Sequence, residues 1–181
     1  MEGIIVPYEK KIAIVYKSKY GCTMKYAGWL AIKLDADLYE INDVGRWDLL
    51  KYKTIVFGSP IYNSKIYSLD FIIDKFDSIK FKNIIIFCPT LNIQTHEEII
   101  NYNFVDKEMN DRIKIFFLDG SINYDELNII DKILLKKLLN KKMKEHNLAY
   151  EHINLEKNIS LDKMNKKSIK PILDYILEKT F

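Results

Sequence analysis

Short apolar runs alternate with longer segments of helical period along most of the chain. Five of the apolar runs are rich in β-branched and aromatic residues, which predicts strands. The predicted strands are Ile12–Tyr16, Asp37–Ile41, Thr54–Gly58, Ile84–Cys88 and Ile113–Leu118. Several are apolar nearly throughout instead of alternating, which is typical of strands covered on both faces. The pattern therefore indicates a sheet buried between layers of helices.

Apolar residues at helical spacing separate the predicted strands. The predicted helices are Thr23–Leu34, Arg46–Leu50, Lys65–Phe76, Glu97–Met109 and a closing helix at Lys166–Lys179. Alternation of strands and helices predicts an α/β fold with three layers, in which right-handed crossovers join the strands of a parallel sheet. For five strands we expect the order 2-1-3-4-5, with a ligand at the carboxyl ends of the strands, where strands 1 and 3 meet.

One segment departs from this plan. About residues 119–162 lie between the fifth strand and the closing helix, and they begin with a helical pattern over Asp125–Glu145. The chain of 181 residues has the length of one domain. We therefore predict a single domain over residues 1–181 that carries an insertion at 119–162.

The helix predicted at 125–145 is both apolar and basic. Its apolar residues form one wide face: Leu127, Ile130, Ile133, Leu134, Leu135 and Leu138. From Lys132 to Lys144 it carries several lysines and no acidic residue. Such a helix can cover a sheet edge, pair two subunits in a homodimer, or lie peripherally on an anionic membrane. These three alternatives stay open from the sequence.

The composition narrows the classes of function. The chain is 48% hydrophobic, which suits a folded core, and its small net charge of +3 leads us to expect no nucleic-acid partner. Cys22 and Cys88 form no disulfide framework and no metal-ligand spacing, so we predict no metal site and a cytoplasmic protein. Residues 1–10 lack the apolar run of a signal peptide, and no aliphatic run is long enough to cross a membrane.

The segment from Ser18 to Thr23 has the chemistry of an anion site. It follows the first strand and leads directly into a helix, whose amino terminus offers unpaired N–H groups and the positive end of the helix dipole. Gly21 can adopt positive φ, and the hydroxyls of Ser18 and Thr23 add hydrogen-bond donors. Neither GxxxxGK nor GxGxxG is present, so the segment predicts the phosphate of a mononucleotide.

Two loops carry a resemblance to a known family. Ser18-Lys19-Tyr20-Gly21-Cys22-Thr23 resembles the flavodoxin phosphate loop (S/T)-x-(S/T)-G-x-T, with Tyr20 in place of the usual hydroxyl residue. Gly58-Ser59-Pro60-Ile61-Tyr62-Asn63 resembles the G-(S/T)-P-(I/T)-Y loop that flavodoxin domains lay against the isoalloxazine ring. Together with a third loop at Pro89–Asn92, the resemblance implies a flavodoxin-like fold and FMN as cofactor. The cofactor-binding residues that it implies are Ser18, Lys19, Tyr20, Gly21, Cys22, Thr23, Ser59, Pro60, Ile61, Tyr62, Asn63, Thr90, Leu91 and Asn92.

Within that family the chain resembles the flavodoxin-like, quinone-dependent protoporphyrinogen oxidases. The shared features are the GSPIY loop and a glycine-containing turn, Asp119-Gly120-Ser121, that leads into an amphipathic helix. The resemblance implies an FMN-dependent oxidoreductase that passes electrons from protoporphyrinogen IX to a quinone, peripheral to the inner face of a membrane. No catalytic side chain is predicted, because the cofactor itself carries the electrons.

Two alternative functions stay open. The first is a flavodoxin-type electron carrier that serves a protein partner and has no organic substrate. Such carriers are usually strongly acidic, whereas this chain has 28 Lys+Arg against 25 Asp+Glu. The second alternative is a non-catalytic interaction domain that has kept the fold and lost FMN.

Overall fold

A parallel sheet forms the centre of the molecule. The computed structural model describes residues 11–45, 48–62, 64–91, 95–104, 106–146 and 160–180. Its five-stranded sheet has the order β2-β1-β3-β6-β7. The strands are β1 (Ile12–Tyr16), β2 (Asp37–Glu40), β3 (Thr54–Gly58), β6 (Asn83–Thr90) and β7 (Ile113–Asp119). Counted within this sheet alone, the order is 2-1-3-4-5, so the predicted α/β class and topology are confirmed.

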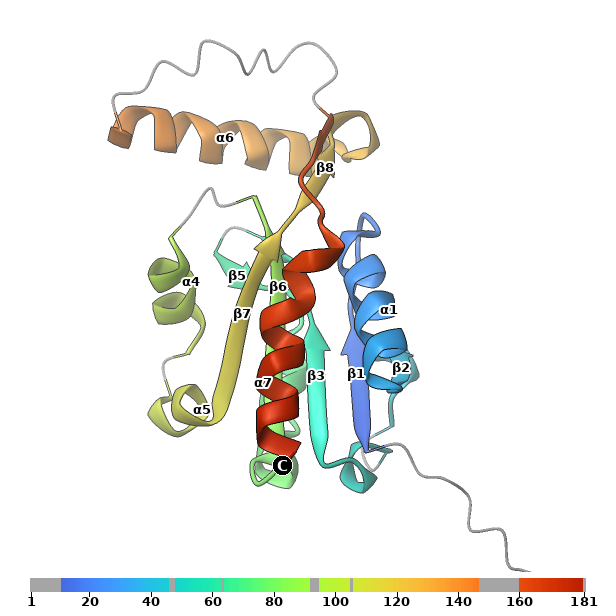
Figure 1. Cartoon of the computed structure of the whole chain (residues 1–181). Helices are drawn as coiled ribbons and strands as arrows, with labels where there is room; N and C mark the ends of the chain where they lie inside the picture. The colour runs from blue at the N-terminus through green and yellow to red at the C-terminus, as the bar shows by residue number, and fades with distance from the viewer. Residues whose placement is uncertain are drawn as a thin grey trace, which may run out of the picture.

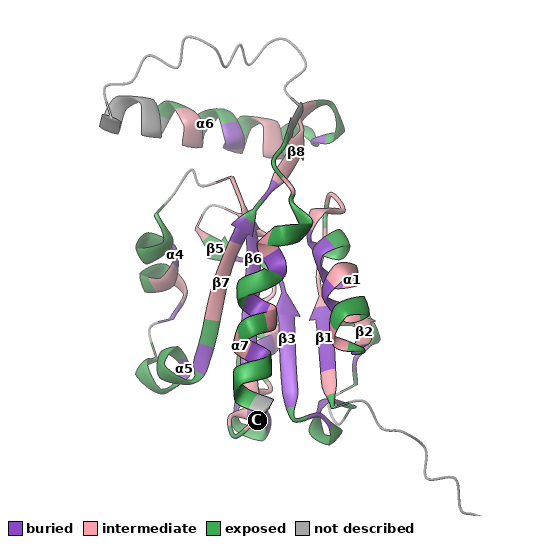
Figure 2. Ribbon diagram, viewed as in Figure 1, coloured by how far each residue is buried: buried purple, intermediate pink, exposed green. Residues whose placement is uncertain are grey.

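Helices cover both faces of the sheet. The covering helices are α1 (Cys22–Leu34), α2 (Leu69–Ile73), α3 (Phe76–Ile79), α4 (His96–Asn103), α5 (Lys107–Arg112) and α7 (Lys170–Thr180). A further helix, α6 (Ile129–His146), lies across one end of the sheet (Figure 1). Figure 1 shows α1 and α7 on the near face of the sheet. Each covering helix turns a buried stripe toward the strands and an exposed face toward solvent (Figure 2).

Alternation along the strands produces two cores. Successive side chains of a strand point to opposite faces of the sheet. Ile14 and its cross-strand partner Val56 are fully buried in the core beneath α1 and α7. The next pair, Val15 and Phe57, is buried in the opposite core, beneath α2, α3 and α4. The continuous apolar runs of the sequence follow from burial on both sides.

Two predicted helices are divided in the structure. The segment Lys65–Phe76 begins as the short strand β5 (Lys65–Ile66) and continues into α2. The segment Glu97–Met109 splits into α4 and α5. The carboxylate of Asp106 accepts a hydrogen bond from the Met109 N–H at 2.8 Å, which caps a new helix start. The apolar spacing continues across both breaks, which is why periodicity alone joins the pieces.

Three other predicted helices differ at their ends. In place of Arg46–Leu50 the described residues form the 3-10 turn η2 (Asp48–Lys51), while residues 46 and 47 lie outside the described residues. The helix predicted over Asp125–Glu145 is α6, preceded by the 3-10 turn η3 (Tyr124–Glu126). The predicted closing helix begins as the 3-10 turn η4 (Lys166–Ile169) before α7.

Small antiparallel pairs lie at the carboxyl end of the sheet. β4 (Ile61–Tyr62) pairs with β5, and β8 (Ser121–Asn123) pairs with β9 (Ser160–Asp162). The strand arrows of β3 and β7 point toward the end of the molecule across which α6 lies (Figure 1). None of the helices in the described ranges combines the length and apolar character that a bilayer crossing needs.

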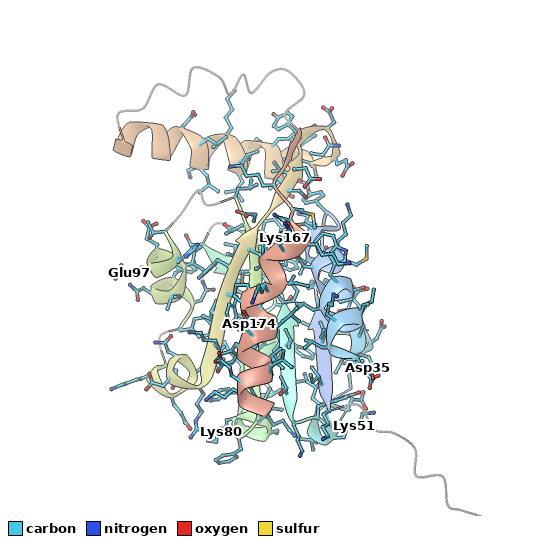
Figure 3. All side chains as sticks on the ribbon, in the orientation of Figure 1. Asp35, Lys51, Lys80, Glu97, Lys167 and Asp174 are labelled. Carbon is cyan, nitrogen blue, oxygen red and sulfur yellow. The ribbon has the colours of Figure 1, made fainter. Side chains whose placement is uncertain are left out.

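Charged side chains of both signs are distributed over the rest of the surface. In Figure 3, Lys51 and Lys80 lie at the end of the sheet opposite α6, whereas Lys167 lies nearer to α6. Asp174 projects from α7 and pairs with Lys170 at 2.5 Å, one helical turn away. The labelled charges are thus spread along the molecule and form no single charged patch in this view.

Candidate functional site

The loops that leave the sheet are held side by side at its carboxyl end. Three backbone hydrogen bonds continue the parallel ladder beyond the strands: Lys17 N–H to Gly58 O (2.9 Å), Ser59 N–H to Phe87 O (3.1 Å) and Gly120 N–H to Thr90 O (2.8 Å). Each bond joins the first residue after one strand to the neighbouring strand of the sheet. The segments after β1, β3 and β6, which the sequence predicts to converge, lie at one edge of the sheet together with the segment after β7.

The loop after β1 has free hydrogen-bonding capacity. Gly21 adopts a left-handed conformation with φ of 83°, and no side chain caps the amino terminus of α1 that follows. The hydroxyl oxygen of Ser18 is buried and has no hydrogen-bond partner in the structure. A buried polar group without a partner is costly, so such a group commonly marks a place where a ligand or water binds. This loop is suited to an anion.

The loop after β3 is fixed by its own contacts. The hydroxyl of Ser59, which is 1% exposed, accepts a hydrogen bond from the Ser68 N–H at 3.1 Å. The side-chain amide of Asn103 donates to Ser64 O at 2.5 Å, and its oxygen accepts from the Ile66 N–H at 2.8 Å. These bonds tie the β4–β5 hairpin to α4. Tyr62, on β4, is thereby presented at the carboxyl end of the sheet.

A pocket lies where these loops meet. Its lining includes Ser18, Lys19, Tyr20, Cys22, Thr23, Pro60, Ile61, Tyr62, Thr90 and Leu91, which the sequence predicts as site residues. Of the other predicted residues, Gly21 supports the loop and Ser59 is occupied with Ser68, and neither lines the pocket. Asn63 and Asn92 lie outside the described residues. The structure thus gathers most of the predicted set around one cavity.

The inserted segment supplies a wall that the sequence prediction does not contain. Leu127, Asp131, Leu134, Leu135 and Leu138 line the pocket from η3 and α6. Ile130 and Ile133, predicted on the same apolar face, are 74% and 64% exposed. Only the narrower stripe at 131, 134, 135 and 138 lines the pocket, so the wide apolar face of the sequence is divided between the pocket and the outward side of α6. The apolar stripe was the available signal, but nothing in it says what it covers.

Gly120 and its neighbours complete the rim. A Cβ at Gly120 would lie 3.0 Å from the carbonyl oxygen of Thr90, so the close approach of these two loops requires glycine. Ser121 and Ile122 of β8 follow it in the lining. The loop after β7 therefore joins the pocket, as the fold rule for parallel sheets would lead one to expect.

One carboxylate connects α6 to the loop after β1. Asp131 accepts a hydrogen bond from the Tyr20 hydroxyl and pairs with the Lys19 ammonium at 2.6 Å. Burial opposes ionisation of Asp131, but the bonds from Lys19 and Tyr20 outweigh it and hold the pKa of this carboxyl below its usual value. The bond to Asp131 raises the pKa of Lys19. Burial, followed by the bond to Asp131, raises the pKa of Tyr20.

The remaining titratable groups of the pocket are held neutral. Burial raises the pKa of the Tyr62 phenol and of the Cys22 thiol. The ammonium of Lys19 lies 5.1 Å from the ring centroid of Tyr62, within range of a cation–π interaction. Within the described ranges, no three His, Cys, Asp or Glu side chains are grouped to hold a metal ion. Lys19 and Asp131 are therefore the paired charges of an otherwise largely apolar lining.

Comparisons with known proteins agree with this architecture. The family model described as Flavodoxin domain matches residues 13–149. Flavodoxin 2 from Bacillus cereus is 19% identical, with a TM-score of 0.43, and the match covers 74% of this chain and 95% of that one. Flavodoxin 1 from Bacillus cereus is 14% identical, with a TM-score of 0.41, over 76% and 99% of the two chains.

A larger protein is matched over part of its length. The flavodiiron protein from Giardia intestinalis is 16% identical, with a TM-score of 0.38, and the match covers 75% of this chain and 35% of that one. A search among curated proteins finds no significant match to the sequence.

Proposed function

Because the chain belongs to the flavodoxin domain family, we propose that it binds FMN in the pocket beneath α6 and acts as an oxidoreductase on a small apolar partner. The observation that carries the proposal is the unpartnered Ser18 hydroxyl, buried in the lining of a pocket that the first, third and fourth sheet strands share. It is the kind of group that a bound phosphate satisfies.

The residues present fit FMN at both of its ends. The loop from Ser18 to Thr23 and the uncapped start of α1 supply donors for the phosphate. Ile61 and Tyr62, at the carboxyl end of β3, supply an apolar and aromatic surface for the ring. When bound, FMN supplies the electron-transfer chemistry, while the protein orients it and excludes water.

The position of α6 favours an enzyme over a simple electron carrier. A carrier exposes its flavin edge to a protein partner, whereas here Leu134 and Leu138 line the pocket from the far side. An apolar wall opposite the ring loop leaves room for a small apolar reactant instead of a protein surface. The chain also lacks the acidic excess of carriers, since its net charge is +3.

We propose protoporphyrinogen as the electron donor and a quinone as the acceptor. Both carry an apolar body, a macrocycle of methylene-bridged pyrroles in the donor and a planar ring in the quinone, which suits the leucine wall. The resemblance of the GSPIY loop and of the turn at Gly120 to the protoporphyrinogen oxidases adds support. Formation of fluorescent protoporphyrin by the FMN-loaded protein, with a quinone present, is the direct assay. If the folded, FMN-loaded protein forms no protoporphyrin in this assay, protoporphyrinogen is excluded as the donor.

The first experiment is an FMN titration of the purified protein, in which quenching of flavin fluorescence measures binding. We expect saturable binding, which Ser18→Ala weakens about fivefold through loss of roughly 1 kcal/mol of hydrogen bonding. Ser78→Ala, an exposed serine on α3, is the matched control and should bind as the wild type does. A protein that takes up no FMN would end the proposal and favour the non-catalytic alternative.

A second experiment separates enzyme from carrier. After reduction, the FMN-loaded protein is reoxidised with a soluble naphthoquinone or with ferricyanide. Leu138→Asn places a polar group in the apolar wall, so the naphthoquinone reaction should slow more than the ferricyanide reaction. Equal rates for the variant and the wild type with both acceptors would favour the carrier.

We also propose that the outward face of α6 contacts an anionic membrane surface. Ile129, Ile130 and Ile133 are 77%, 74% and 64% exposed on that face. Lys136 and Lys137, one turn further on, are exposed as well. Exposed isoleucines beside lysines are the combination that interfacial helices use to bind anionic lipid. Such contact would bring the pocket close to a lipid-dissolved quinone.

A further inference from the structure

The amino terminus of α6 is docked on the loop after β1 through one acidic residue. Asp131 lies in the first turn of α6, where Asn128 accepts its N–H at 2.8 Å. The Asp131 carboxylate, with a side chain 12% exposed, binds the Lys19 ammonium at 2.6 Å and the Tyr20 hydroxyl. The Asn128 N–H in turn donates to the Tyr20 oxygen at 3.3 Å. The Asp131 carboxylate thus accepts hydrogen bonds from two neighbouring donors of the predicted phosphate loop.

The donors of that loop fall into two groups. The Ser18 hydroxyl and the uncapped start of α1 are available to a ligand. The side chains of Lys19 and Tyr20 are instead committed to α6. A phosphate bound at Ser18 would lie beside the cation of Lys19, which is the natural counter-ion for it. Two anions, one from the ligand and one from the protein, would then share a single cation.

The length of the Tyr20 side chain explains its contact with α6. In the loop pattern that this chain resembles, a short hydroxyl residue stands at this position. A phenol carries its hydroxyl several ångströms further from the backbone than serine or threonine does. Here that reach places the Tyr20 oxygen against Asp131 and Asn128 of the insert. The departure from the pattern therefore serves the contact with α6.

We propose that Asp131 is an affinity-determining residue that competes with the flavin phosphate for Lys19 and Tyr20. The inference rests on the proposed function, since it concerns the same pocket. With no phosphate bound, the carboxylate holds α6 over the pocket. A bound phosphate draws Lys19 toward itself, and the repulsion between the two anions weakens FMN binding and loosens α6. The ring of the flavin does not enter this competition.

Comparing FMN with riboflavin isolates the phosphate. Both flavins are titrated against wild type, Asp131→Asn and the control Asp125→Asn. Asp125 is an exposed acid of η3 outside the pocket lining, so its variant matches the change in charge. Asp131→Asn should bind FMN about threefold to tenfold more tightly, the size expected for adjacent surface charges after screening. Its riboflavin affinity and the affinities of Asp125→Asn should stay at wild-type values.

Salt and a second substitution test the same competition. The gain in FMN affinity should shrink between low and high sodium chloride, because salt screens the repulsion. Lys19→Gln removes the shared cation, so Asp131→Asn should gain less in that background than in the wild type. Unfolding curves of each variant show whether the fold is intact before affinities are compared.

The outcomes distinguish this inference from the proposed function. Weaker or unchanged FMN binding by a folded Asp131→Asn would overturn the competition while leaving FMN binding in place. Equal gains for FMN and riboflavin would also overturn it, because the effect would not come from the phosphate. If no variant binds either flavin, the proposed function fails and the inference fails with it.

Discussion

Gly58 shows how a single residue positions the site. It ends β3 where the chain turns into the loop of Ser59 to Tyr62. A Cβ added there would lie 2.7 Å from Cε1 of Phe87 and closer still to its Cζ. Phe87 is fully buried in the core beneath α1 and α7, so its ring has little room to move aside. The glycine of the GSPIY sequence is therefore required by packing, whatever the loop binds.

Substitution of this glycine should destabilise the protein. We expect Gly58→Ala to lower the free energy of unfolding by about 1–3 kcal/mol, the usual cost of overpacking a core. Gly28→Ala is the matched control: Gly28 lies inside α1, and a Cβ there has no neighbour within 4 Å. That control should gain roughly 0.5–1 kcal/mol from helix propensity. Urea unfolding measures both, and a Gly58→Ala protein as stable as the wild type would contradict the packing argument.

At the residue scale, short-range chemistry was predictable and long-range pairing was not. Ser18 and Thr23 were identified from the short hydroxyl-containing loop between the first strand and the first helix, and Tyr62 from the resemblance of the GSPIY loop to flavodoxin domains. Asp131 was missed because its partners Lys19 and Tyr20 lie more than a hundred residues away in the sequence. In sequence it is one acidic residue in the first turn of a helix, where acidic residues are common.

Among the elements, α6 depends on the Lys19–Asp131 pair for its docking. The folded pKa of Asp131 lies below the ordinary value, so the carboxyl contributes stability at pH values above that ordinary value, about 4. This contribution falls away as the pH drops through the lower folded pKa. Lys19, whose pKa is raised, contributes fully below its ordinary value of about 10 and loses the contribution as the pH rises through its higher folded pKa.

The pH dependence can be measured with Asp131→Asn. At neutral pH the variant should be roughly 1 kcal/mol less stable than the wild type, because a partly exposed ion pair and the hydrogen bond from Tyr20 are lost. The difference should narrow progressively as the pH falls below the ordinary aspartate value of about 4 and through the lower folded pKa of Asp131. Urea unfolding from pH 3 to pH 7 follows it. If the difference in the free energy of unfolding between the wild type and Asp131→Asn stays constant across this range, Asp131 is not ionised in the folded protein as assigned.

The strands were easier to predict than the helices. All five sheet strands were found within a few residues, since burial on both faces leaves uninterrupted apolar runs. Helix breaks were missed at Lys65–Phe76 and Glu97–Met109 because apolar spacing continues through them. Asp106 carried the sequence signal for the second break, as a capping residue three positions before Met109.

For the whole molecule, the outward face of α6 predicts lipid binding. We expect sedimentation with vesicles of anionic phosphatidylglycerol at low salt and none with phosphatidylcholine. The double substitution Ile130→Gln and Ile133→Gln should weaken binding about tenfold or more through loss of apolar burial. Ile32→Gln, on α1 and 78% exposed, is the control and should bind as the wild type does.

Two results would count against the lipid assignment. Equal binding to neutral and anionic vesicles would show that the lysines of α6 make no contribution to lipid binding. A homodimer that the same double substitution dissociates, seen by sedimentation in the absence of lipid, would assign the face to a second copy of the chain. The sequence does not distinguish a lipid surface from a second copy of the chain, because both kinds of contact favour apolar residues beside charged ones.

The pairing of β8 with β9 has a consequence for how this protein can diversify. Asn123 and Ser160 are cross-strand partners, so their Cα atoms lie roughly 4.5–5.5 Å apart. The chain leaves this two-stranded pair and returns to it at almost the same point. The segment between those two residues can therefore change in length and sequence without disturbing the strands of the central sheet. Variation in that segment would alter the wall of the pocket while the sheet beneath it stays the same.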